Sequence, residues 1–180
     1  VAFLYQRGSF KLVSHESISP FPKVASRDIL HVVGQLRSGD TLDVFCVHFP
    51  SRIGGKEAEG RRLRVATLLR SKCDSLLLIR KKPSIILMGD FNDSPSDNSL
   101  ITIAQPVSSD SVHFSSGMYN LMTGDIAYSN PKVNGTYRYQ GYWDILDQIL
   151  VNGATLVRTD GFRLSQTGVS VADLDFLLED

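Results

Sequence analysis

Runs of hydrophobic residues predict four β-strands in the first third of the chain. Val1 to Tyr5 is short and apolar, and Phe10 to Val13 follows it closely, which is the pattern of a β-hairpin. Arg27 to Leu36 and Thr41 to His48 are two further β-rich runs, separated by the polar, glycine-containing turn 38–40. We expect these two strands to pair in antiparallel orientation.

A long helix and a buried strand are predicted next. Between Lys56 and Ile79 the apolar positions recur at helical spacing with basic residues between them, which is typical of an amphipathic helix lying on a sheet. Pro83 ends this helix, because proline lacks the N–H that the helix needs. Ser84 to Met88 is a continuous apolar run, typical of a strand buried on both faces, and it leads directly into the polar segment 89–92.

The rest of the chain is less regular. Ser94 to Ala104 predicts a short helix, whereas Gln105 to Asn134 is rich in Ser, Asn and Gly, as in an irregular surface excursion. Thr136 to Tyr139 and Trp143 to Val151 predict two more strands. Many strands combined with one long helix favour an α/β or α+β layered domain.

The composition limits what this domain can be. A chain of 180 residues with 42% hydrophobic and 21% charged residues is sufficient for one folded domain with a sizeable core. The 19 basic residues balance the 19 acidic ones, so no overall field attracts nucleic acid or an anionic membrane. Any affinity for phosphate must therefore be local. The sequence contains no apolar run long enough to predict a membrane span.

The two cysteines, Cys46 and Cys73, occupy apolar positions of the predicted strand and helix. A free thiol at such a position packs as a small hydrophobic group. We predict that both cysteines are reduced and buried, with no disulfide bond between them.

The segment Gly89-Asp90-Phe91-Asn92-Asp93 carries the strongest indication of chemistry. Asp90 and Asn92 are two residues apart at a strand end, so we expect their side chains on one face, with Phe91 on the other. The carboxylate can orient or deprotonate a water, and the amide can donate to a phosphoryl oxygen without adding negative charge. The alternative is an Asx turn that only closes the strand.

Three other polar residues differ from their surroundings. His48 ends an alternating strand and is expected at its rim, although a hydrogen-bonded core histidine is the alternative. Arg52 could bind a phosphate with its planar guanidinium, unless it is only solvated. Asp147 interrupts an apolar strand. Because a buried, unpaired carboxylate is costly, we expect a partner for it, either a histidine or a metal-bound water.

Three motifs occur in order along the chain. They are Val47-His48-Phe49-Pro50-Ser51-Arg52, Gly89-Asp90-Phe91-Asn92-Asp93-Ser94-Pro95, and Gly135-Thr136-Tyr137-Arg138-Tyr139 with Asp147-Gln148-Ile149-Leu150-Val151. Together, though not separately, they resemble the endonuclease/exonuclease/phosphatase superfamily, and its bacterial endonuclease-like members in particular. The resemblance extends from Val1 to about Phe176, so we interpret residues 1–180 as a single domain of this type.

The resemblance implies roles for individual residues. Asp90 and Asn92 match the family pair that activates water and contacts the scissile phosphate, and we assign them to a weak Mg²⁺ or Mn²⁺ site. His48 matches a histidine near that phosphate, and Asp147 matches an aspartate that orients a second histidine. The expected substrate-binding residues are Arg52, Tyr137 and Trp143.

The resemblance also implies the fold, a four-layer α/β/β/α sandwich of the deoxyribonuclease-like type. The family's N-terminal asparagine and glutamate, its principal metal ligands, are expected before Val1, and its Ser-Asp-His signature after Asp180. We therefore expect a partial sandwich, truncated at both ends, with at most weak activity by itself. A sheet left incomplete in this way would expose an edge or an apolar face and invite self-association.

Taken together, the motifs predict a metal-dependent hydrolase of phosphate esters. The expected substrates are phosphodiesters, either nucleic acid or a small molecule. One alternative is a phosphomonoesterase that acts on inositol phosphates or lipid headgroups, since these offer the same scissile group. The other is a non-catalytic fragment or binding module of the same fold, because the principal metal ligands are expected outside the chain.

Overall fold

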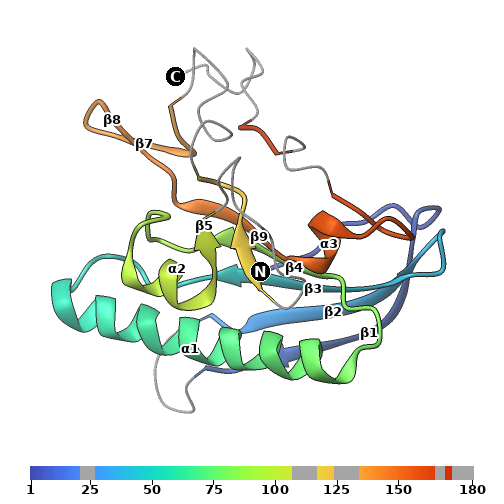
Figure 1. The fold of residues 1–180 in the computed structure, drawn as a ribbon. Coiled ribbons are helices and arrows are strands. Elements are labelled where there is room, and N and C mark those ends of the chain that lie inside the picture. Colours follow the sequence, from blue (N-terminus) through green and yellow to red (C-terminus); the bar gives the residue numbers. More distant parts are fainter. Residues whose placement is uncertain (21–26, 107–116, 124–133, 165–168, 172–180) are drawn as a thin grey trace.

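Seven of the described strands form one mixed sheet at the centre of the structure (Figure 1). The computed structural model describes residues 1–20, 27–106, 117–123, 134–164 and 169–171. The strands are β1 Phe10–Ile18, β2 Ile29–Leu36, β3 Thr41–His48, β4 Ile85–Asp90, β5 Gln105–Pro106, β6 Met118–Asn120, β7 Tyr137–Tyr139, β8 Tyr142–Asp144 and β9 Asp147–Asn152. The helices are α1 Gly55–Ile79, α2 Asn98–Ile103 and α3 Ala154–Val157. The order within the large sheet is β1-β2-β3-β4-β9-β6-β5, and β7 pairs separately with β8.

The predicted pairing of β2 with β3 is confirmed. The two strands are antiparallel, with Leu30 opposite Cys46, on either side of the polar turn. In contrast, β3 and β4 are parallel, so the chain must cross from one end of the sheet to the other between them. α1 makes this crossover, at nearly the bounds predicted from Lys56 to Ile79, and lies along one face of the sheet (Figure 1).

The main hydrophobic core lies between α1 and the sheet. The helix contributes an apolar stripe that includes Leu69 and Cys73, and the strands contribute Phe45 and Leu87. All four side chains are fully buried, and burial raises the pKa of the Cys73 thiol to about 12. Cys46 is also free and buried, in a second cluster on the other face. The predictions for both cysteines are therefore confirmed.

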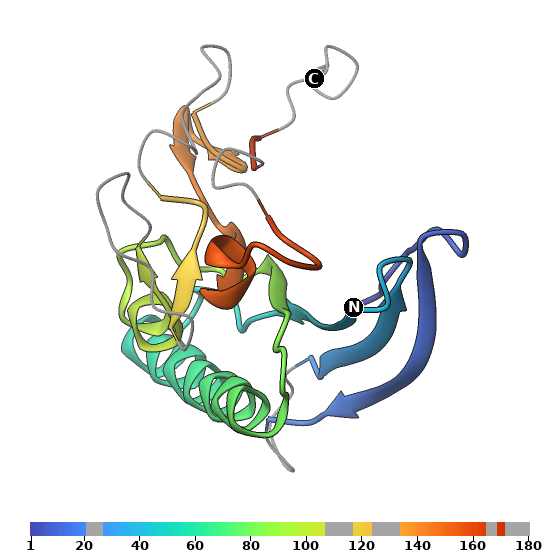
Figure 2. The ribbon, with the colours of Figure 1, turned by 45° about the vertical axis from the view of Figure 1, so that its right-hand side comes forward.

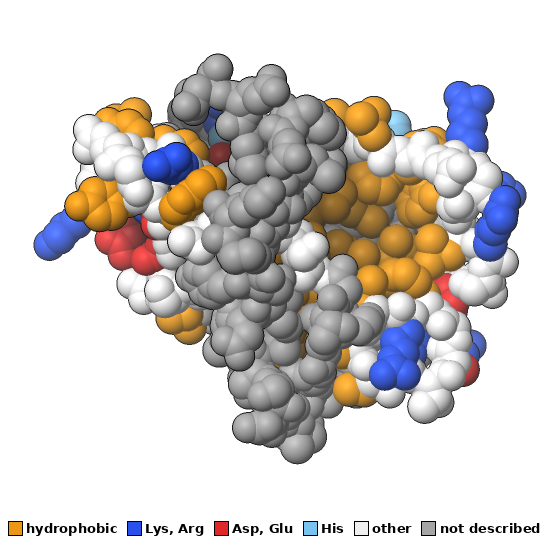
Figure 3. All heavy atoms as spheres, turned by 90° about the horizontal axis from the view of Figure 1, so that it is seen from above, with side chains coloured by type: hydrophobic (Ala, Val, Ile, Leu, Met, Phe, Trp, Pro, Cys, Tyr) orange, Lys and Arg blue, Asp and Glu red, His pale blue; other side chains and the backbone are white. Residues whose placement is uncertain are grey.

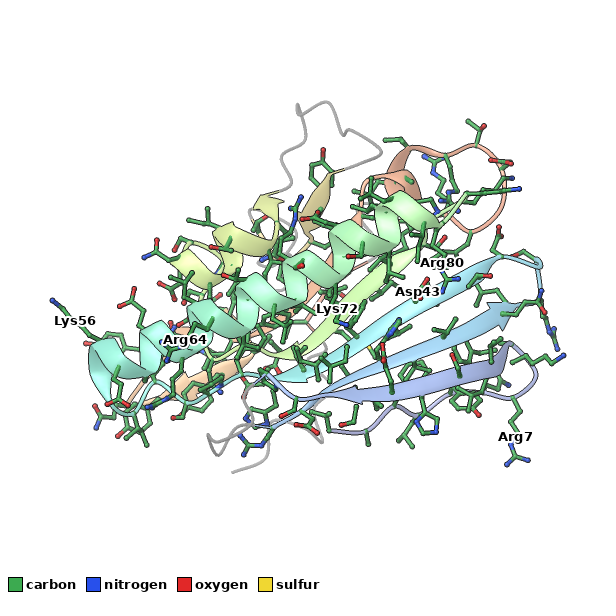
Figure 4. The ribbon with its side chains drawn as sticks, turned by 90° about the horizontal axis from the view of Figure 1, so that it is seen from below. Arg7, Asp43, Lys56, Arg64, Lys72 and Arg80 are labelled. Carbon is green, nitrogen blue, oxygen red and sulfur yellow. The ribbon has the colours of Figure 1, made fainter. Side chains whose placement is uncertain are left out.

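An ionic network interrupts this core near the end of α1. His31 on β2 lies between two carboxylates, since its Nδ1 is 3.0 Å from Glu16 and its Nε2 is 3.0 Å from Asp43. Arg80 donates two hydrogen bonds to Asp43, at 2.9 and 3.0 Å. Figure 4 shows Asp43 and Arg80 close together, with Lys72 further along the helix. The network links β1, β2 and β3 to the end of α1.

The face of the sheet opposite α1 is only partly covered. β4 was expected to be buried on both faces, but this prediction is wrong. Ile85 and Leu87 are fully buried on the α1 side, whereas Ile86 and Met88 on the other side remain partly exposed. Seen from that side, hydrophobic side chains gather in an open hollow (Figure 3). The reason is that the described residues provide a helical layer on one face and no equivalent layer over this part of the other.

The hairpin predicted at the start of the chain is not formed. Val1 to Tyr5 contains no strand, and β1 pairs with β2 instead. Phe3 and Tyr5 pack their rings against Phe10, with ring centroids 5.4 and 5.1 Å from that of Phe10. Aromatic packing, rather than strand pairing, therefore accounts for the apolar pattern of this segment.

Two further predictions differ from the structure. Much of the excursion predicted for Gln105 to Asn134 lies outside the described residues, but it contains β6, a fully buried strand that pairs with β9. The single strand predicted from Trp143 to Val151 is broken at Ile145 and Leu146 into β8 and β9, which belong to different sheets. Both residues at the break are buried. A continuous apolar pattern does not distinguish a strand from a buried connection.

The architecture is an α/β fold, as predicted. Of the four layers expected for an α/β/β/α sandwich, the described residues form the large sheet and the helical layer on one of its faces. The β7–β8 hairpin projects from the body of the molecule (Figure 2). None of the helices in the described ranges combines the length and apolar character needed to cross a membrane.

Candidate active site

His48, Asp90 and Asp147 lie at the ends of three neighbouring strands. His48 is opposite Asp90 in the parallel pair of β3 and β4, and Asp90 is opposite Asp147 in the antiparallel pair of β4 and β9. Residues opposite each other in a sheet project from the same face. Cys46 and Met88, which precede His48 and Asp90 by two positions, belong to the cluster on the face opposite α1. The structure thus brings three of the predicted residues together at one edge of that face.

The closest contact in this group joins His48 and Asp90. The Nε2 atom of His48 lies 3.4 Å from Oδ2 of Asp90, and the two side chains are 34% and 33% exposed. His48 is therefore at the rim of the sheet and accessible to a ligand, rather than a buried core histidine. The core histidine of the described region is His31, which is only 8% exposed.

Asn92 is held directly beside Asp90. Its backbone N–H donates a 2.8 Å hydrogen bond to Oδ1 of Asp90, and its side-chain amide donates a 3.0 Å bond to the carbonyl of Phe49. The first bond is an Asx turn, so the structural alternative for this motif is present. Phe91 points to the other side and is fully buried, as predicted. Among the described residues, the amide oxygen of Asn92 has no hydrogen-bond partner, and the only polar side chain near Oδ2 of Asp90 is His48.

Gly89 permits the close approach of β3 and β4 next to these residues. Its φ angle is +134°, and a Cβ atom built on it would lie 2.1 Å from the carbonyl oxygen of Val47. That distance is shorter than any van der Waals contact, so a larger residue would separate the strands that carry His48 and Asp90. The glycine of the Gly-Asp-Phe-Asn motif is thus needed for the geometry of the site.

Asp147 differs from its predicted environment. It was expected within a buried strand, but it is exposed at the first position of β9, because the strand begins only after the break at Ile145 and Leu146. Its backbone N–H, like that of Leu146, donates a 3.0 Å hydrogen bond to the hydroxyl of Thr136. Within the described ranges, no side chain forms a hydrogen bond or ion pair with its carboxylate. The partner expected for Asp147 is thus not found among the described residues.

Arg52 is bound to the protein on several sides. Its Nε donates to the carbonyl of Asn92 at 2.9 Å, and its Nη1 donates to Oδ2 of Asp144 at 3.1 Å. Its Nη2 donates to Ser94 and to Asp97, at 3.1 and 3.4 Å. The side chain is 42% exposed, yet it is far from freely solvated. It links the loops after β3 and β4 to the end of β8.

The predicted substrate-binding residues Tyr137 and Trp143 lie on the β7–β8 hairpin. Tyr137 is 46% exposed and stacks on Tyr139, with the ring planes 11° apart. The guanidinium of Arg138 lies over the ring of Trp143, 5.6 Å from its centroid. The hairpin therefore presents aromatic surface to solvent, close to the loop that contains Asn92.

A hollow of about 700 Å³ adjoins these residues. Trp143, Asp147 and Thr136 border it on one side, and Cys46 and Met88 form part of its apolar wall. Asp147 and Trp143 of the hairpin thus lie at the border of the open apolar face.

Sequence reasoning missed several residues whose contacts hold the loop after β4 and Arg52 in place. Asp93 is buried, accepts a 2.7 Å hydrogen bond from Ser99, and lies 2.7 Å from Nε of Arg62, an ion pair without hydrogen-bond alignment. Asp144, the partner of Arg52, was also missed. The contacts of Arg62 with Asp93 and of Arg52 with Asp144 join residues far apart in the sequence. The only available signal was a basic residue on the apolar side of the helix pattern, at Arg62.

Comparison with known proteins gives the family. The sequence model described as the endonuclease/exonuclease/phosphatase family matches residues 1–180. This chain belongs to the endonuclease/exonuclease/phosphatase family. No curated protein matches the sequence. The family predicted from the three motifs is therefore confirmed.

Solved structures share the fold of this family member. Truncated TDP2 of Caenorhabditis elegans is 16% identical with a TM-score of 0.58, over 81% of this chain and 54% of that one. The human Nocturnin catalytic domain with bound sulfate is 16% identical with a TM-score of 0.54, over 82% and 50% of the two chains. A family protein from Bacteroides thetaiotaomicron is 17% identical with a TM-score of 0.52, over 82% and 52%. The chain spans about half the length of these structures, and the likeness concerns the fold alone.

The family implies a divalent metal ion, and the described residues fit one only in part. Asp90 and Asn92 offer oxygen atoms, the ligand type that Mg²⁺ prefers. However, no group of three or more His, Cys, Asp or Glu side chains in the described ranges could hold a metal ion. One carboxylate and one amide oxygen would leave most of the coordination shell to water.

Proposed function

We propose that the protein is a hydrolase of phosphodiesters that acts at the strand ends carrying His48, Asp90 and Asn92. The observation that supports this most directly is the His48–Asp90 pair, 3.4 Å apart and about one-third exposed, beside an asparagine at the same strand end. The fold of the endonuclease/exonuclease/phosphatase family is consistent with phosphodiesterase or nuclease chemistry.

Each residue has a role that its position allows. Asp90 accepts the Asn92 N–H on one oxygen and leaves the other to orient a water or accept its proton. His48 lies beside that oxygen and can bind the scissile phosphate or exchange a proton with it. Asn92 has one amide N–H left for a phosphoryl oxygen after its bond to Phe49. Asp147, free of partners in the described region, can orient a histidine supplied from elsewhere.

We propose that a divalent metal ion assists the reaction. When bound, Mg²⁺ or Mn²⁺ would offset the negative charge that develops on the phosphoryl oxygens. Asp90 and Asn92 are the residues we assign to it. Because they alone offer few ligands, we propose that the 180-residue chain has at most weak activity by itself.

We infer that the substrate is a nucleic acid or a small phosphodiester. Trp143 borders the same hollow as Asp147, and Tyr137 is exposed on the same hairpin, so both offer aromatic surface on which a base or another ring could stack. A phosphomonoesterase and a non-catalytic binding module of the same fold remain the two alternatives, and they predict different assay results.

The test is hydrolysis of bis-p-nitrophenyl phosphate, with and without Mg²⁺, by the 180-residue chain and by a chain extended at both ends. Asp90→Asn should lower kcat of the active chain by at least about 100-fold. Asp74→Asn is the matched control, since Asp74 is a half-exposed carboxylate on α1 paired with Arg70. Faster hydrolysis of p-nitrophenyl phosphate would indicate a monoesterase. An absence of metal-dependent turnover by either chain would favour the binding module.

The open apolar face leads us to propose self-association as well. Val44 and Cys46 belong to its cluster, and Met88 and Ile86 pack against them only partly buried. An apolar surface of this kind is costly to leave in contact with water. Sedimentation velocity of the chain should therefore show a molecular mass that increases with concentration, and a constant monomer mass would contradict the proposal.

A further inference from the structure

Arg52 directs its guanidinium at protein acceptors rather than at the open site. The group has five N–H donors, and four hydrogen bonds to Asn92, Asp144, Ser94 and Asp97 occupy all but one of them. At most one N–H is then left for a phosphate, and bidentate binding of a phosphate needs two. A different role has to account for this residue.

The bonds of Arg52 join three separate segments. Arg52 itself follows β3, Asn92 to Asp97 follow β4, and Asp144 ends β8. The β7–β8 hairpin is not part of the seven-stranded sheet. A two-stranded hairpin is marginal by itself in water and needs contacts with the rest of the molecule to keep a fixed position. The Arg52–Asp144 ion pair is one such contact, and it ends at the residue next to Trp143.

We propose that Arg52 is a positioning residue whose ion pair with Asp144 holds the β7–β8 hairpin, and with it Trp143, beside the candidate catalytic loop. Its hydrogen bond to the Asn92 carbonyl connects Arg52 to the loop after β4 as well. The consequence for catalysis rests on the proposed function, whereas the Arg52–Asp144 ion pair that holds the hairpin is a property of the fold. Arg52 thus serves the placement of a substrate-facing surface rather than phosphate binding.

The ion pair is suited to this local role. The side chains of Arg52 and Asp144 are 42% and 45% exposed, and an ion pair so exposed contributes little to global stability. Breaking it should therefore move the hairpin without unfolding the domain. Asp144→Ala removes only the ion pair with Arg52. Arg52→Gln also removes or weakens the hydrogen bond of Arg52 to the Asn92 carbonyl.

Trp143 provides a specific probe, because it is the only tryptophan of the chain. In the full 180-residue chain, Asp144→Ala and Arg52→Gln should each raise the acrylamide quenching constant of Trp143 by about twofold, as expected when a local contact opens. The midpoint temperature of thermal unfolding should change little. The double variant should be quenched no more than Arg52→Gln, because both substitutions break the same pair. Arg61→Gln, which removes the Arg61–Glu57 pair on α1, is the matched control and should have no effect.

Unchanged quenching in Asp144→Ala, or additive effects in the double variant, would overturn the proposal. If Arg52→Gln fails to fold, the quenching of Trp143 in Asp144→Ala is the test, since this variant leaves the other bonds of Arg52 in place. In hydrolysis of bis-p-nitrophenyl phosphate by an active chain, Asp144→Ala should raise KM by about fivefold with kcat unchanged, as for a lost binding contact. A change in quenching, together with no turnover by either the 180-residue or the extended wild-type chain, would support the positioning role of Arg52 and contradict the proposed function.

Discussion

His48 and Asp90 are opposite each other on the parallel strands β3 and β4, and this register places Nε2 of the histidine 3.4 Å from the carboxylate. Both residues are the last of their strands. The carboxyl ends of adjacent parallel strands necessarily meet at one edge of a sheet, so α1, which makes the crossover between them, is what brings the two motifs together. The candidate site thus follows from topology as much as from residue type.

Metal binding near this pair is the first prediction. Mn²⁺ added to the protein should broaden the NMR signals of the His48 imidazole, because a cation held by Asp90 would lie close to that ring. Asp90→Asn removes the only carboxylate of the pair and should weaken Mn²⁺ binding by about tenfold or more, which corresponds to about 1.4 kcal/mol. EDTA should reverse the broadening. Asp74→Asn should leave it unchanged, and equal broadening in Asp90→Asn would exclude Asp90 as a ligand.

Gly89→Ala is the second prediction. The new Cβ would lie 2.1 Å from the carbonyl oxygen of Val47 and would require a φ of +134°, so β3 and β4 would have to separate. The free energy of unfolding in urea should fall by more than about 3 kcal/mol, as expected for combined overpacking and backbone strain. Gly39→Ala is the control. Gly39 also has a positive φ, +88°, but no atom lies within 4 Å of its Cβ position, and the cost should be about 1 kcal/mol. Similar losses for both variants would contradict the steric argument.

The elements predicted best were those in which one local pattern determines the structure. The spacing of apolar residues in α1 and the polar turn between β2 and β3 depend on neighbouring residues alone, and both predictions are confirmed. Trp143 to Val151 shows the limit of this reasoning. Its apolar residues continue through the break at Ile145 and Leu146, because a buried connection needs the same side chains as a buried strand.

The candidate site was predictable to the extent that its residues end strands. His48 and Asp90 could be placed from alternation and from the buried run before Gly89. The contacts of Arg52 could not, since Asp144 and Asn92 lie 92 and 40 positions away in the sequence. Such contacts depend on how the hairpin and the loops meet in three dimensions, which no local pattern encodes.

The network around His31 leads to the last prediction, which concerns pH. Burial would lower the pKa of His31, but the hydrogen bonds and charges of Asp43 and Glu16 outweigh burial and raise it. Burial would raise the pKa of Asp43, but its hydrogen bonds with His31 and Arg80 outweigh burial and lower it. The hydrogen bond with His31 likewise lowers the pKa of Glu16. Lys72 on α1 adds a further positive charge near Glu16. The network is therefore most stable with His31 charged and both carboxylates ionised.

The sign of the pH effect follows from this raised pKa. The unfolded histidine has a pKa of about 6.5, so protonated His31 stabilises the fold fully below that pH. The stabilisation is lost as the pH rises through the higher pKa of the folded state. His31→Gln should thus lower the free energy of unfolding by about 1 to 3 kcal/mol at pH 5.5, as expected for lost charged hydrogen bonds. The loss should be clearly smaller at pH 9. Urea unfolding at both pH values is the measurement, with His15→Gln, a substitution at an exposed position of β1, as the control. A loss that is the same at both pH values would show that His31 stabilises the protein by packing rather than by charge.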